Sequence, residues 1–211
     1  MMKGLKYIGI TVLTGLLFAC EPDKVTEGIS DITFFPVITL KGEQWDEVPL
    51  GTKYTDPGVT AKEGDTEITA AVTGAVDEKT AGVYTIQYDA VNKDGYASTE
   101  YRYVGVIDPS AKVTDITGAY KRNAGEGGIS NVTKVSGNLY HSDNIGGVAI
   151  PNAGLGVYFY YYAKGKLGVP FQLTPGNSFE ATNGTIVEGV QYSWVVINPG
   201  YGTAVRTFIK Q

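Results

Sequence analysis

Cysteine and histidine are nearly absent from this sequence. Its 211 residues include one cysteine, Cys20, and one histidine, His141. A single cysteine cannot close a disulfide within the chain, and structural zinc sites need several cysteine or histidine ligands at regular spacing. The oxygen-bearing side chains of Asp89, Asn92 and Asp94 lack the regular ligand spacing and the bidentate glutamate of a calcium loop. We therefore expect no disulfide, no bound metal and no other cofactor.

Catalytic motifs are missing as well. The sequence has no nucleophile elbow, no glycine-rich phosphate loop and no zinc-type histidine pair. His141, Ser142 and Asp143 are consecutive, and adjacent residues of a strand or turn cannot converge as a catalytic triad does. Paired carboxylates could still hydrolyse glycosides. The second half offers only Asp115, Glu126, Asp143, Glu180 and Glu188 for that purpose. We expect a protein that is not an enzyme.

Long apolar runs are also missing, except for a short one near the start. Residues 7–18 are mostly apolar, follow Lys3 and Lys6, and are closed by Cys20. The run is too short for a permanent transmembrane helix and has the length of a signal-peptide core. Residues 17–20, Leu-Phe-Ala-Cys, resemble the lipobox of bacterial lipoproteins. This resemblance implies a signal peptide over residues 1–19 and lipidation of Cys20. The alternative is an ordinary cleaved signal that leaves a soluble secreted protein.

Residues 20–31 are polar and acidic and show no usable period, so we expect a flexible tether there. Glu21, Asp23 and Glu27 resemble a diluted form of the surface-export signal that some gut-commensal Gram-negative bacteria place after the lipidated cysteine. The lipid anchor implies attachment to the outer membrane. The acidic signal favours the cell surface, with the periplasmic face as the alternative.

Basic residues are outnumbered by acidic ones, 17 to 22 over the whole chain. Binding to nucleic acid requires a basic surface, so nucleic acid is excluded as an expected partner. The imbalance is uneven: residues 1–108 hold nine basic and seventeen acidic residues, and residues 109–211 hold eight and five. This change of sign predicts two domains, residues 32–108 and residues 109–211.

Glycine and tyrosine are abundant, with 28 and 15 residues. Clusters of Gly, Asn and Asp recur about every ten residues between short segments of Val, Ile, Thr and Tyr, which is typical of antiparallel sheets. We therefore expect an all-β protein. About seven short strands over residues 32–108 indicate an immunoglobulin-like sandwich, with a first strand over residues 32–40 and a hairpin of residues 82–90 and 99–107.

Two motifs of this first domain are specific. Residues 50–61, LGTKYTDPGVTA, and residues 81–88, AGVYTIQY, are followed by an Asn-x-Asp-Gly turn and by Arg102, Val104 and Val106. Together they resemble a bacterial immunoglobulin-like family that is also found in some pesticidal crystal toxins. The resemblance implies a module that spaces and presents other domains. Turn formation and core packing account for the motif residues without a ligand.

The second domain also consists of short apolar segments. Its candidate strands are residues 115–122, 129–135, 139–142, 156–163, 169–173, 185–187, 190–198 and 203–210. Eight strands in about a hundred residues predict a second antiparallel sandwich or a small barrel. Residues 115–123 and 206–210 resemble the carboxy-terminal domain that follows such modules in uncharacterised lipoproteins of polysaccharide-utilising gut bacteria.

Aromatic strands supply the candidate ligand-binding residues. These are Tyr160, Tyr161, Tyr162, Tyr192 and Trp194. Consecutive residues of a strand point to opposite faces, so about half of the rings in residues 158–162 cannot lie in one core. An exposed row of such rings would suit the apolar face of a sugar. The alternative is that one face is core and the other covers the seam between the domains. Trp45 is expected on a loop, as a site residue or as a packing lid.

These observations predict a non-catalytic outer-membrane lipoprotein, held to the membrane by its N-terminal lipid, which presents a carboxy-terminal β domain. The expected ligand is an extracellular glycan taken up as polysaccharide. The alternative is an adhesion or assembly subunit that binds another outer-membrane protein. A contiguous aromatic row with polar groups nearby would favour sugar, whereas a broad apolar patch or an exposed edge strand would favour protein.

Overall fold

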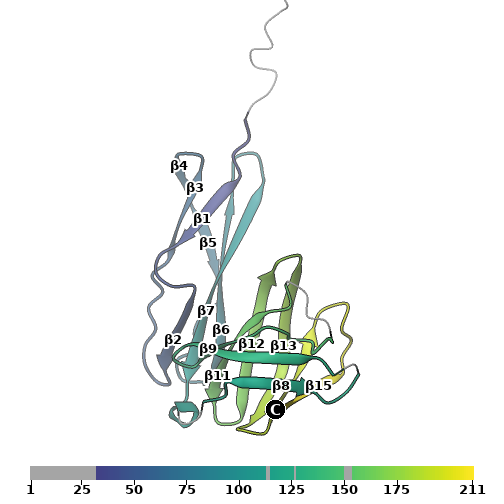
Figure 1. Cartoon of the computed structure of the whole chain (residues 1–211). Helices are drawn as coiled ribbons and strands as arrows, with labels where there is room; N and C mark the ends of the chain where they lie inside the picture. The colour runs from purple at the N-terminus through teal and green to yellow at the C-terminus, as the bar shows by residue number, and fades with distance from the viewer. Residues whose placement is uncertain (1–31, 113–114, 126, 150–153) are drawn as a thin grey trace, which may run out of the picture. The chain divides into compact units, whose positions relative to one another are not determined.

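The computed structural model describes residues 32–112, 115–125, 127–149 and 154–211. The predicted signal peptide, the lipidation site Cys20 and the tether lie outside the described residues. Within them, Phe35–Gln211 form one compact unit. Its elements are β-strands and one short 3-10 helix, which confirms the all-β prediction (Figure 1). No helix of the described ranges is both long enough and apolar enough to cross a membrane.

Seven strands form the first module, which we define as residues 36–107. They are β1 (Pro36–Leu40), β2 (Trp45–Pro49), β3 (Val59–Glu63), β4 (Thr66–Ile68), β5 (Ala70–Thr73), β6 (Gly82–Val91) and β7 (Ala97–Ile107). One sheet has the order β1-β3-β4 and the other β2-β7-β6-β5. Strand β2 runs parallel to β7, and the remaining pairs are antiparallel. The predicted two-sheet sandwich is confirmed.

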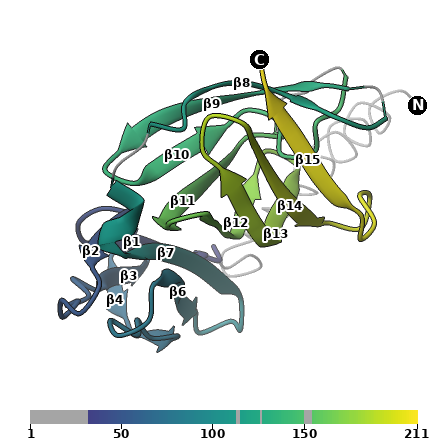
Figure 2. The same cartoon turned by 90° about the horizontal axis from the view of Figure 1, so that it is seen from below.

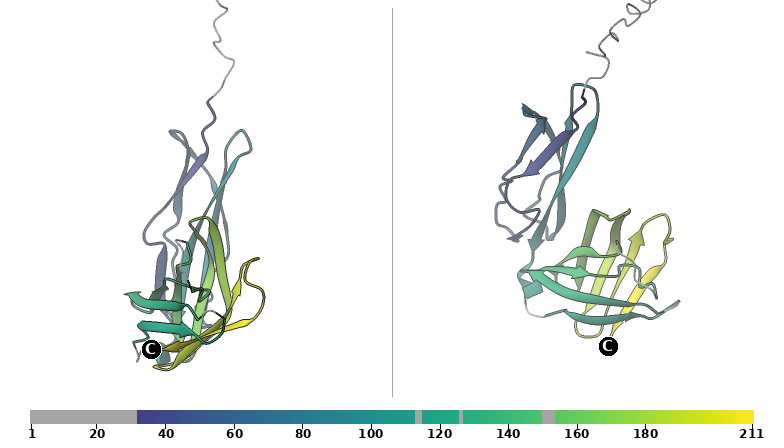
Figure 3. Two further views of the ribbon diagram at one scale, coloured as in Figure 1. Left: turned by 45° about the vertical axis from the view of Figure 1, so that its right-hand side comes forward. Right: turned by 45° about the horizontal axis from the view of Figure 1, so that its top comes forward.

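The β6–β7 hairpin is the longest ribbon of the first module (Figure 3). On β6, Ile86, Tyr88 and Ala90 are buried, as alternation along a strand requires. The turn is closed by Asn92, whose side-chain oxygen accepts hydrogen bonds from the backbone N–H groups of Asp94 at 3.1 Å and Tyr96 at 2.8 Å. An Asx turn therefore accounts for the Asn-x-Asp-Gly sequence.

The first strand begins later than predicted. Strand β1 starts at Pro36, which pairs with Glu63, the last residue of β3. Strand β3 ends at Glu63 and is followed by a turn at residues 64–65, and residues 32–35 are not part of a strand. The predicted start of the first strand at residue 32 is therefore wrong, and the strand ladder with β3 begins at Pro36.

A buried arginine joins the turn at residues 56–58 to the core of the first module. Arg102 is fully buried, and its guanidinium donates to the carbonyl oxygens of Lys41 at 2.7 Å and Gly58 at 3.2 Å. The Asp56 carboxylate lies 3.5 Å from Arg102 Nε and accepts a hydrogen bond from the Tyr88 hydroxyl at 2.7 Å. The motif residues therefore have a structural role that explains their presence.

Eight strands form the barrel, which we define as residues 118–210. They are β8 (Gly118–Arg122), β9 (Ile129–Ser136), β10 (Leu139–Ser142), β11 (Val157–Ala163), β12 (Lys166–Thr174), β13 (Asn177–Val187), β14 (Gln191–Ile197) and β15 (Val205–Lys210). Their order β10-β11-β12-β13-β14-β15-β8-β9 closes on itself through the β9–β10 pair (Figure 2). Of the two folds left open by the sequence, the structure has the barrel.

Aromatic rings fill the barrel. Tyr192 stacks on Phe208 with ring centroids 4.6 Å apart, and Trp194 lies edge-on to Phe159 at 5.6 Å. The indole N–H of Trp194 donates to the carbonyl oxygen of Ile145 at 2.9 Å, so the buried ring leaves no donor unpaired. This core is the larger of the two hydrophobic clusters of the described residues.

The connection between the two modules is packed into the barrel core. Ile107, at the end of β7, and Ala111, in the short helix η2 (Pro109–Lys112), both belong to that core. The backbone N–H of Asp108 donates to the carbonyl oxygen of Tyr162 at 2.7 Å. The predicted boundary near residue 108 falls in this connection, and the division into separately folding domains stays a prediction.

Candidate functional site

Six side-chain rings from the first module and the barrel form a continuous series. In order they are Phe171, Tyr101, Tyr103, Trp45, Tyr158 and His141, and we call them the aromatic row. Successive ring centroids are 5.8, 6.3, 4.1, 5.1 and 4.9 Å apart. The rings are therefore contiguous, which is the arrangement that would favour a sugar ligand over a protein partner.

Strand geometry explains how distant parts of the chain contribute to this row. Tyr101 and Tyr103 are two residues apart on β7 and share a face. Trp45 is opposite Tyr103 in the parallel β2–β7 pair, and its ring stacks on Tyr103 with an interplanar angle of 24°. In the barrel, His141 is opposite Tyr158 in the β10–β11 pair. Two cross-strand pairs therefore supply the centre and one end of the row.

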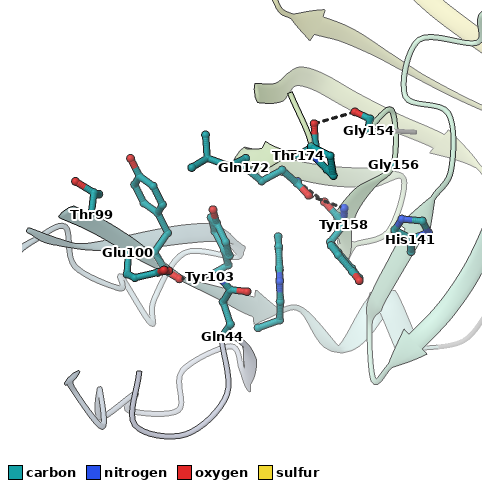
Figure 4. Close-up of a pocket in the computed structure, with 14 residues that line it drawn as sticks. Gln44, Thr99, Glu100, Tyr103, His141, Gly154, Gly156, Tyr158, Gln172 and Thr174 are labelled. Atoms are coloured by element: carbon teal, nitrogen blue, oxygen red, sulfur yellow. Dashed lines mark hydrogen bonds between the residues drawn. The ribbon is translucent and has the colours of Figure 1, made fainter. Parts of the chain in front are cut away.

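A groove of about 520 Å³ runs beside the aromatic row (Figure 4). Five of the six rings line it, all except Phe171. Its other lining residues are Gln44, Thr99, Glu100, Gly154, Gly156, Gln172, Leu173, Thr174 and Pro175. Figure 4 shows Thr99, Glu100 and Tyr103 on β7, Gln44 just before β2, and His141, Tyr158, Gln172 and Thr174 on the barrel. The volume and the mixed lining fit a small-molecule or oligosaccharide site.

Hydrogen bonds hold the barrel wall of the groove in place. Gln172 is buried, and its side-chain amide donates to the Tyr158 carbonyl oxygen and accepts from the Tyr158 N–H, both at 2.8 Å. The Gln172 amide thereby replaces a backbone pairing between β11 and β12. The Thr174 hydroxyl donates to the Gly154 carbonyl oxygen at 2.8 Å. These bonds fix the polar edge of the groove before any ligand binds.

His141 lies at the barrel end of the groove, close to the backbone of Gly156. A Cβ atom at Gly156 would lie 2.7 Å from His141 Nε2, so a residue with a side chain would displace the imidazole. Burial lowers the pKa of His141, and the nearby Asp143 carboxylate partly offsets this effect. At neutral pH the imidazole is therefore neutral, with one nitrogen able to donate and the other able to accept a hydrogen bond.

The Tyr103 phenol in the groove stays protonated. Burial raises the pKa of Tyr103 well above its usual value, and the neighbouring Tyr101 and Glu100 raise it further. Glu100 is the one carboxylate among the described lining residues, and none of them is a lysine or an arginine. The groove thus offers aromatic faces, neutral hydrogen-bonding groups and a single carboxylate.

Three of the predicted site residues lie in the barrel core. Tyr161 and Trp194 are fully buried, and Tyr192 is 1% exposed. The Tyr161 hydroxyl donates to Glu188, and burial together with this bond raises the pKa of Tyr161 to about 12. An exposed row of these rings was predicted, and that prediction is wrong because β11 and β14 turn these side chains into the barrel.

The other two predicted residues face the first module. Tyr160 is 1% exposed and donates from its hydroxyl to the Asp46 carbonyl oxygen at 2.7 Å. Tyr162 is half-buried against the barrel core cluster. A Cβ atom at Gly105 on β7 would lie 2.7 Å from the Tyr160 ring, so only glycine permits this close approach. The structure therefore matches the alternative interpretation of this strand: one face of β11 lies in the barrel core, and the other partly covers the seam between the barrel and the first module.

Sequence reasoning missed most of the aromatic row. Of its members, Trp45 was singled out, and the structure places it at the start of β2 with its ring between Tyr103 and Tyr158. The Tyr101-x-Tyr103 spacing on a predicted strand was a usable signal for two rings on one face. Nothing local marks Gln172 as the residue that holds Tyr158.

The His-Ser-Asp sequence does not form a triad. The Ser142 hydroxyl is buried against Ser130 Oγ at 2.7 Å, and the Asp143 carboxylate accepts from Asn131 N and Nδ2, each at 2.7 Å. The His141 ring instead faces Tyr158. Within the described ranges, no three His, Cys, Asp or Glu side chains gather closely enough to hold a metal ion.

Residues 38–106 match the family model described as "Bacterial surface protein, Ig-like domain". The match covers most of the first module and confirms the immunoglobulin-like family resemblance of this segment. It does not extend into the barrel, which contributes eight of the fourteen residues that line the groove.

Among solved structures, the chain is similar to a lipoprotein of Bacteroides thetaiotaomicron, with 22% identity, a TM-score of 0.37, and coverage of 84% of this chain and 100% of that one. A structure of the CBM51-2 domain in complex with GlcNAc and INT domains of Clostridium perfringens ZmpB has 16% identity, a TM-score of 0.30, and coverage of 74% of this chain and 30% of that one. A structure of the M60 catalytic domain of the same protein with its CBM51-1 and CBM51-2 domains has 13% identity and a TM-score of 0.31. The match covers 83% of this chain and 21% of that one. Similarities of this degree establish neither ligand nor activity. No curated protein matches the chain.

Proposed function

We propose that this protein is a non-catalytic glycan-binding protein of the bacterial cell envelope, and that the groove beside the aromatic row holds the glycan in polysaccharide uptake. The observation that carries the proposal is the row itself. Six rings from two modules follow one another at 4.1 to 6.3 Å, five of them along a groove of about 520 Å³.

The chemistry of the lining supports a sugar ligand. A pyranose ring has an apolar face of C–H groups and an edge of hydroxyl groups. The rings of Trp45, Tyr101 and Tyr158 can pack against such a face, and Gln44, Thr99 and Glu100 can hydrogen-bond its edge. Packing against aromatic rings and hydrogen bonds to a few fixed polar groups can orient an uncharged ligand, which does not need a strong electrostatic attraction to the protein.

The lining favours binding over cleavage. Glycoside hydrolysis normally uses two carboxyl groups on either side of the scissile bond. Among the described lining residues of this groove, Glu100 is the one carboxylate. The neutral His141 imidazole could accept a proton, but the groove presents no nucleophile held by a hydrogen bond to it in the described part of the chain.

For location, we propose a lipid anchor at Cys20 and attachment to the outer membrane, with the groove directed to the outside of the cell. The lipobox-like residues 17–20 and the acidic tether support this. The match of residues 38–106 to a surface-protein module is in line with an envelope location.

Binding to another protein is a second candidate function, and one observation favours it. Strand β5 lies at the edge of its sheet, and Val72 on it is 58% exposed. An exposed edge strand with an apolar side chain can pair with a strand of another chain. This strand is in the first module, away from the residues of the aromatic row, so variants can separate the two functions.

Polysaccharide binding by the purified full-length chain tests the proposal. We expect retention on at least one member of an array of purified plant, host and microbial polysaccharides. Replacing Tyr158, which is 38% exposed, by alanine should weaken the affinity at least about tenfold because it removes the ring between Trp45 and His141. Isothermal titration calorimetry with the retained polysaccharide measures the change.

Tyr96→Ala is the matched control, because Tyr96 is a 49% exposed tyrosine outside the groove. Its affinity should equal that of the unchanged chain. Melting temperatures of both variants show whether a loss reflects unfolding. If no polysaccharide of the array is retained, or if Tyr158→Ala and Tyr96→Ala bind alike, the proposed function is refuted. Loss of protein capture on Val72→Lys with no glycan retention would favour the second candidate.

A further inference from the structure

A second hollow adjoins the groove. It has a volume of about 360 Å³ and is lined by Glu43, Gln44, Trp45, Val135, Ser136, Leu139 and Tyr158. Gln44, Trp45 and Tyr158 line both hollows. The central rings of the aromatic row therefore form a ridge with a hollow on each side. A ligand packed on that ridge reaches into both.

The charges along these hollows have one sign. Glu100 lines the groove and Glu43 lines the second hollow, and none of the described residues lining either one is a lysine or an arginine. More carboxylates follow next to Trp45 on β2. Glu47 is held there by the N–H of Asn138 at 2.7 Å, and Asp46 lies beside it.

The basic residues nearest in the sequence to the lining do not offset this charge. The Lys134 ammonium lies 5.8 Å from the ring of Tyr140, a residue of the barrel core. The Arg102 guanidinium is buried on Lys41 and Gly58 carbonyl oxygens and paired with Asp56 inside the first module. Among the described lining residues of the two hollows, a negatively charged ligand would therefore meet two carboxylates and no lysine or arginine.

From this arrangement we infer that the two hollows are one binding surface that takes an uncharged or amino-sugar chain of several units and rejects anionic glycans. The inference rests on the proposed function and adds the ligand class to it. Chain length follows from the shared ridge, since a single ring cannot fill hollows on both sides of Trp45 and Tyr158. Charge selection follows from Glu43 and Glu100, because like charges brought together in a site oppose binding.

The test uses matched pairs of polysaccharides that differ in charge alone. Each pair is an acidic polysaccharide, uronic or sulfated, and its carboxyl-reduced or desulfated product. We expect the full-length chain to retain neutral or amino-sugar members and to bind each acidic parent at least about tenfold more weakly. The discrimination should shrink as salt is raised, because exposed charges are screened.

Two variants assign the discrimination to the named carboxylates. Combining Glu43→Gln with Glu100→Gln should bring the affinities for the acidic parents to within about threefold of those for their neutral products. The ratio of the two affinities is the measured quantity, because Glu100 can also hydrogen-bond a neutral sugar. Glu67→Gln is the matched control, since Glu67 is an exposed carboxylate on β4 that lines neither hollow. It should leave the discrimination unchanged.

A third variant tests chain length. Ser136→Trp places a bulky side chain in the second hollow, at an exposed position at the end of β9. We expect it to weaken binding of an oligosaccharide at least about fivefold and binding of the corresponding monosaccharide by less than about twofold.

The outcomes separate the inference from the proposed function. If an acidic parent binds as tightly as its neutral product and Tyr158→Ala abolishes both, the protein binds glycans but the charge selection is wrong. If Ser136→Trp affects monosaccharide and oligosaccharide equally, the two hollows do not act as one surface. If no glycan of either charge is retained, the proposed function itself fails.

Discussion

Two sets of aromatic rings in this protein are built from the same residue types and have opposite environments. Tyr192, Trp194 and Phe208 pack against one another inside the barrel and are at most 1% exposed. Trp45 and Tyr158 also lie within 5.1 Å of each other, yet they border a groove, and Tyr158 is 38% exposed.

The difference comes from what covers each face of the strands. A closed barrel gives every strand one inner face, and the rings there are shielded from water on all sides. The outer face of β11 meets the first module only in part: Tyr160 is covered by β7 and Asp46, whereas Tyr158 lies beyond the covered area. The rings that line the groove therefore lie where two modules meet incompletely, and not where aromatic residues are densest.

The largest effects are expected from truncating one ring of each set. Truncation of the core ring should reduce mainly stability, and truncation of the groove ring should reduce mainly binding. Trp194→Ala removes a fully buried indole and leaves a cavity, so we expect the free energy of unfolding to fall by about 3–5 kcal/mol. Tyr101→Ala removes a half-buried ring at the groove, and its cost should be about 1 kcal/mol. Denaturant unfolding followed by circular dichroism measures both.

Glycan affinity provides the second readout for the same two variants. Where Trp194→Ala still folds, its affinity should stay near that of the unchanged chain, whereas Tyr101→Ala should lose affinity. A Trp194→Phe variant, which keeps most of the apolar volume, should recover much of the stability. A Trp194 variant with unchanged stability and lost binding would show that the ring belongs to a ligand site after all.

The partly covered face can be disturbed through a single glycine. Gly105→Ala would place a Cβ atom 2.7 Å from Tyr160, so either β7 or the tyrosine ring must move. We expect a loss of about 1–3 kcal/mol in the free energy of unfolding. Because Trp45 lies 6.1 Å from Tyr160, the shift should also reduce glycan affinity.

Gly82→Ala is the matched control for this overlap. Gly82 is also a strand glycine of the first module, and its nearest neighbour to a new Cβ atom is Tyr84 at 3.7 Å, an ordinary contact. It should change stability by less than about 0.5 kcal/mol. If Tyr160→Ala fails to relieve part of the Gly105→Ala loss in the double variant, the overlap is not the cause.

Much of the fold was predictable because its signals are local. The β6–β7 hairpin follows from alternating Ile86 and Tyr88 and from a turn that Asn92 can close by itself. Strand β13 was recognised only at residues 185–187 although it spans Asn177–Val187. Its polar sequence hides it, and at Asn183 the backbone has a φ of 54°, where the β13–β14 register shifts.

The groove was less predictable because it depends on non-local packing. The two-residue alternation of a strand predicts which tyrosines of residues 158–162 share a face. It does not predict that the first module covers Tyr160 and leaves Tyr158 exposed to solvent. That outcome depends on the parallel pairing of Trp45 with Tyr103, nearly sixty residues apart. No pattern within either strand encodes this pairing, so the sequence alone could name Trp45 without placing it.

His141 allows the smallest effect to be measured, because it is the single histidine of the chain and lines the groove. Burial lowers its pKa in the folded protein relative to the usual value of 6.5. The unfolded chain therefore binds the proton more readily. The contribution of the neutral His141 imidazole to the stability of the folded protein is fully present above pH 6.5. It is lost as the pH falls from 6.5 through the folded-state pKa.

We expect NMR titration of the imidazole to give a pKa below 6.5. The unchanged chain should lose more stability than His141→Gln when the pH falls from about 7.5 to about 5.5, since glutamine does not titrate. The carboxylates titrate in both proteins, so the difference between them reports His141. A measured pKa at or above the usual value would mean that water reaches the imidazole freely. The His141 end of the groove would then be as exposed to solvent as Tyr158. The contrast between buried and exposed rings would in that case not extend to His141.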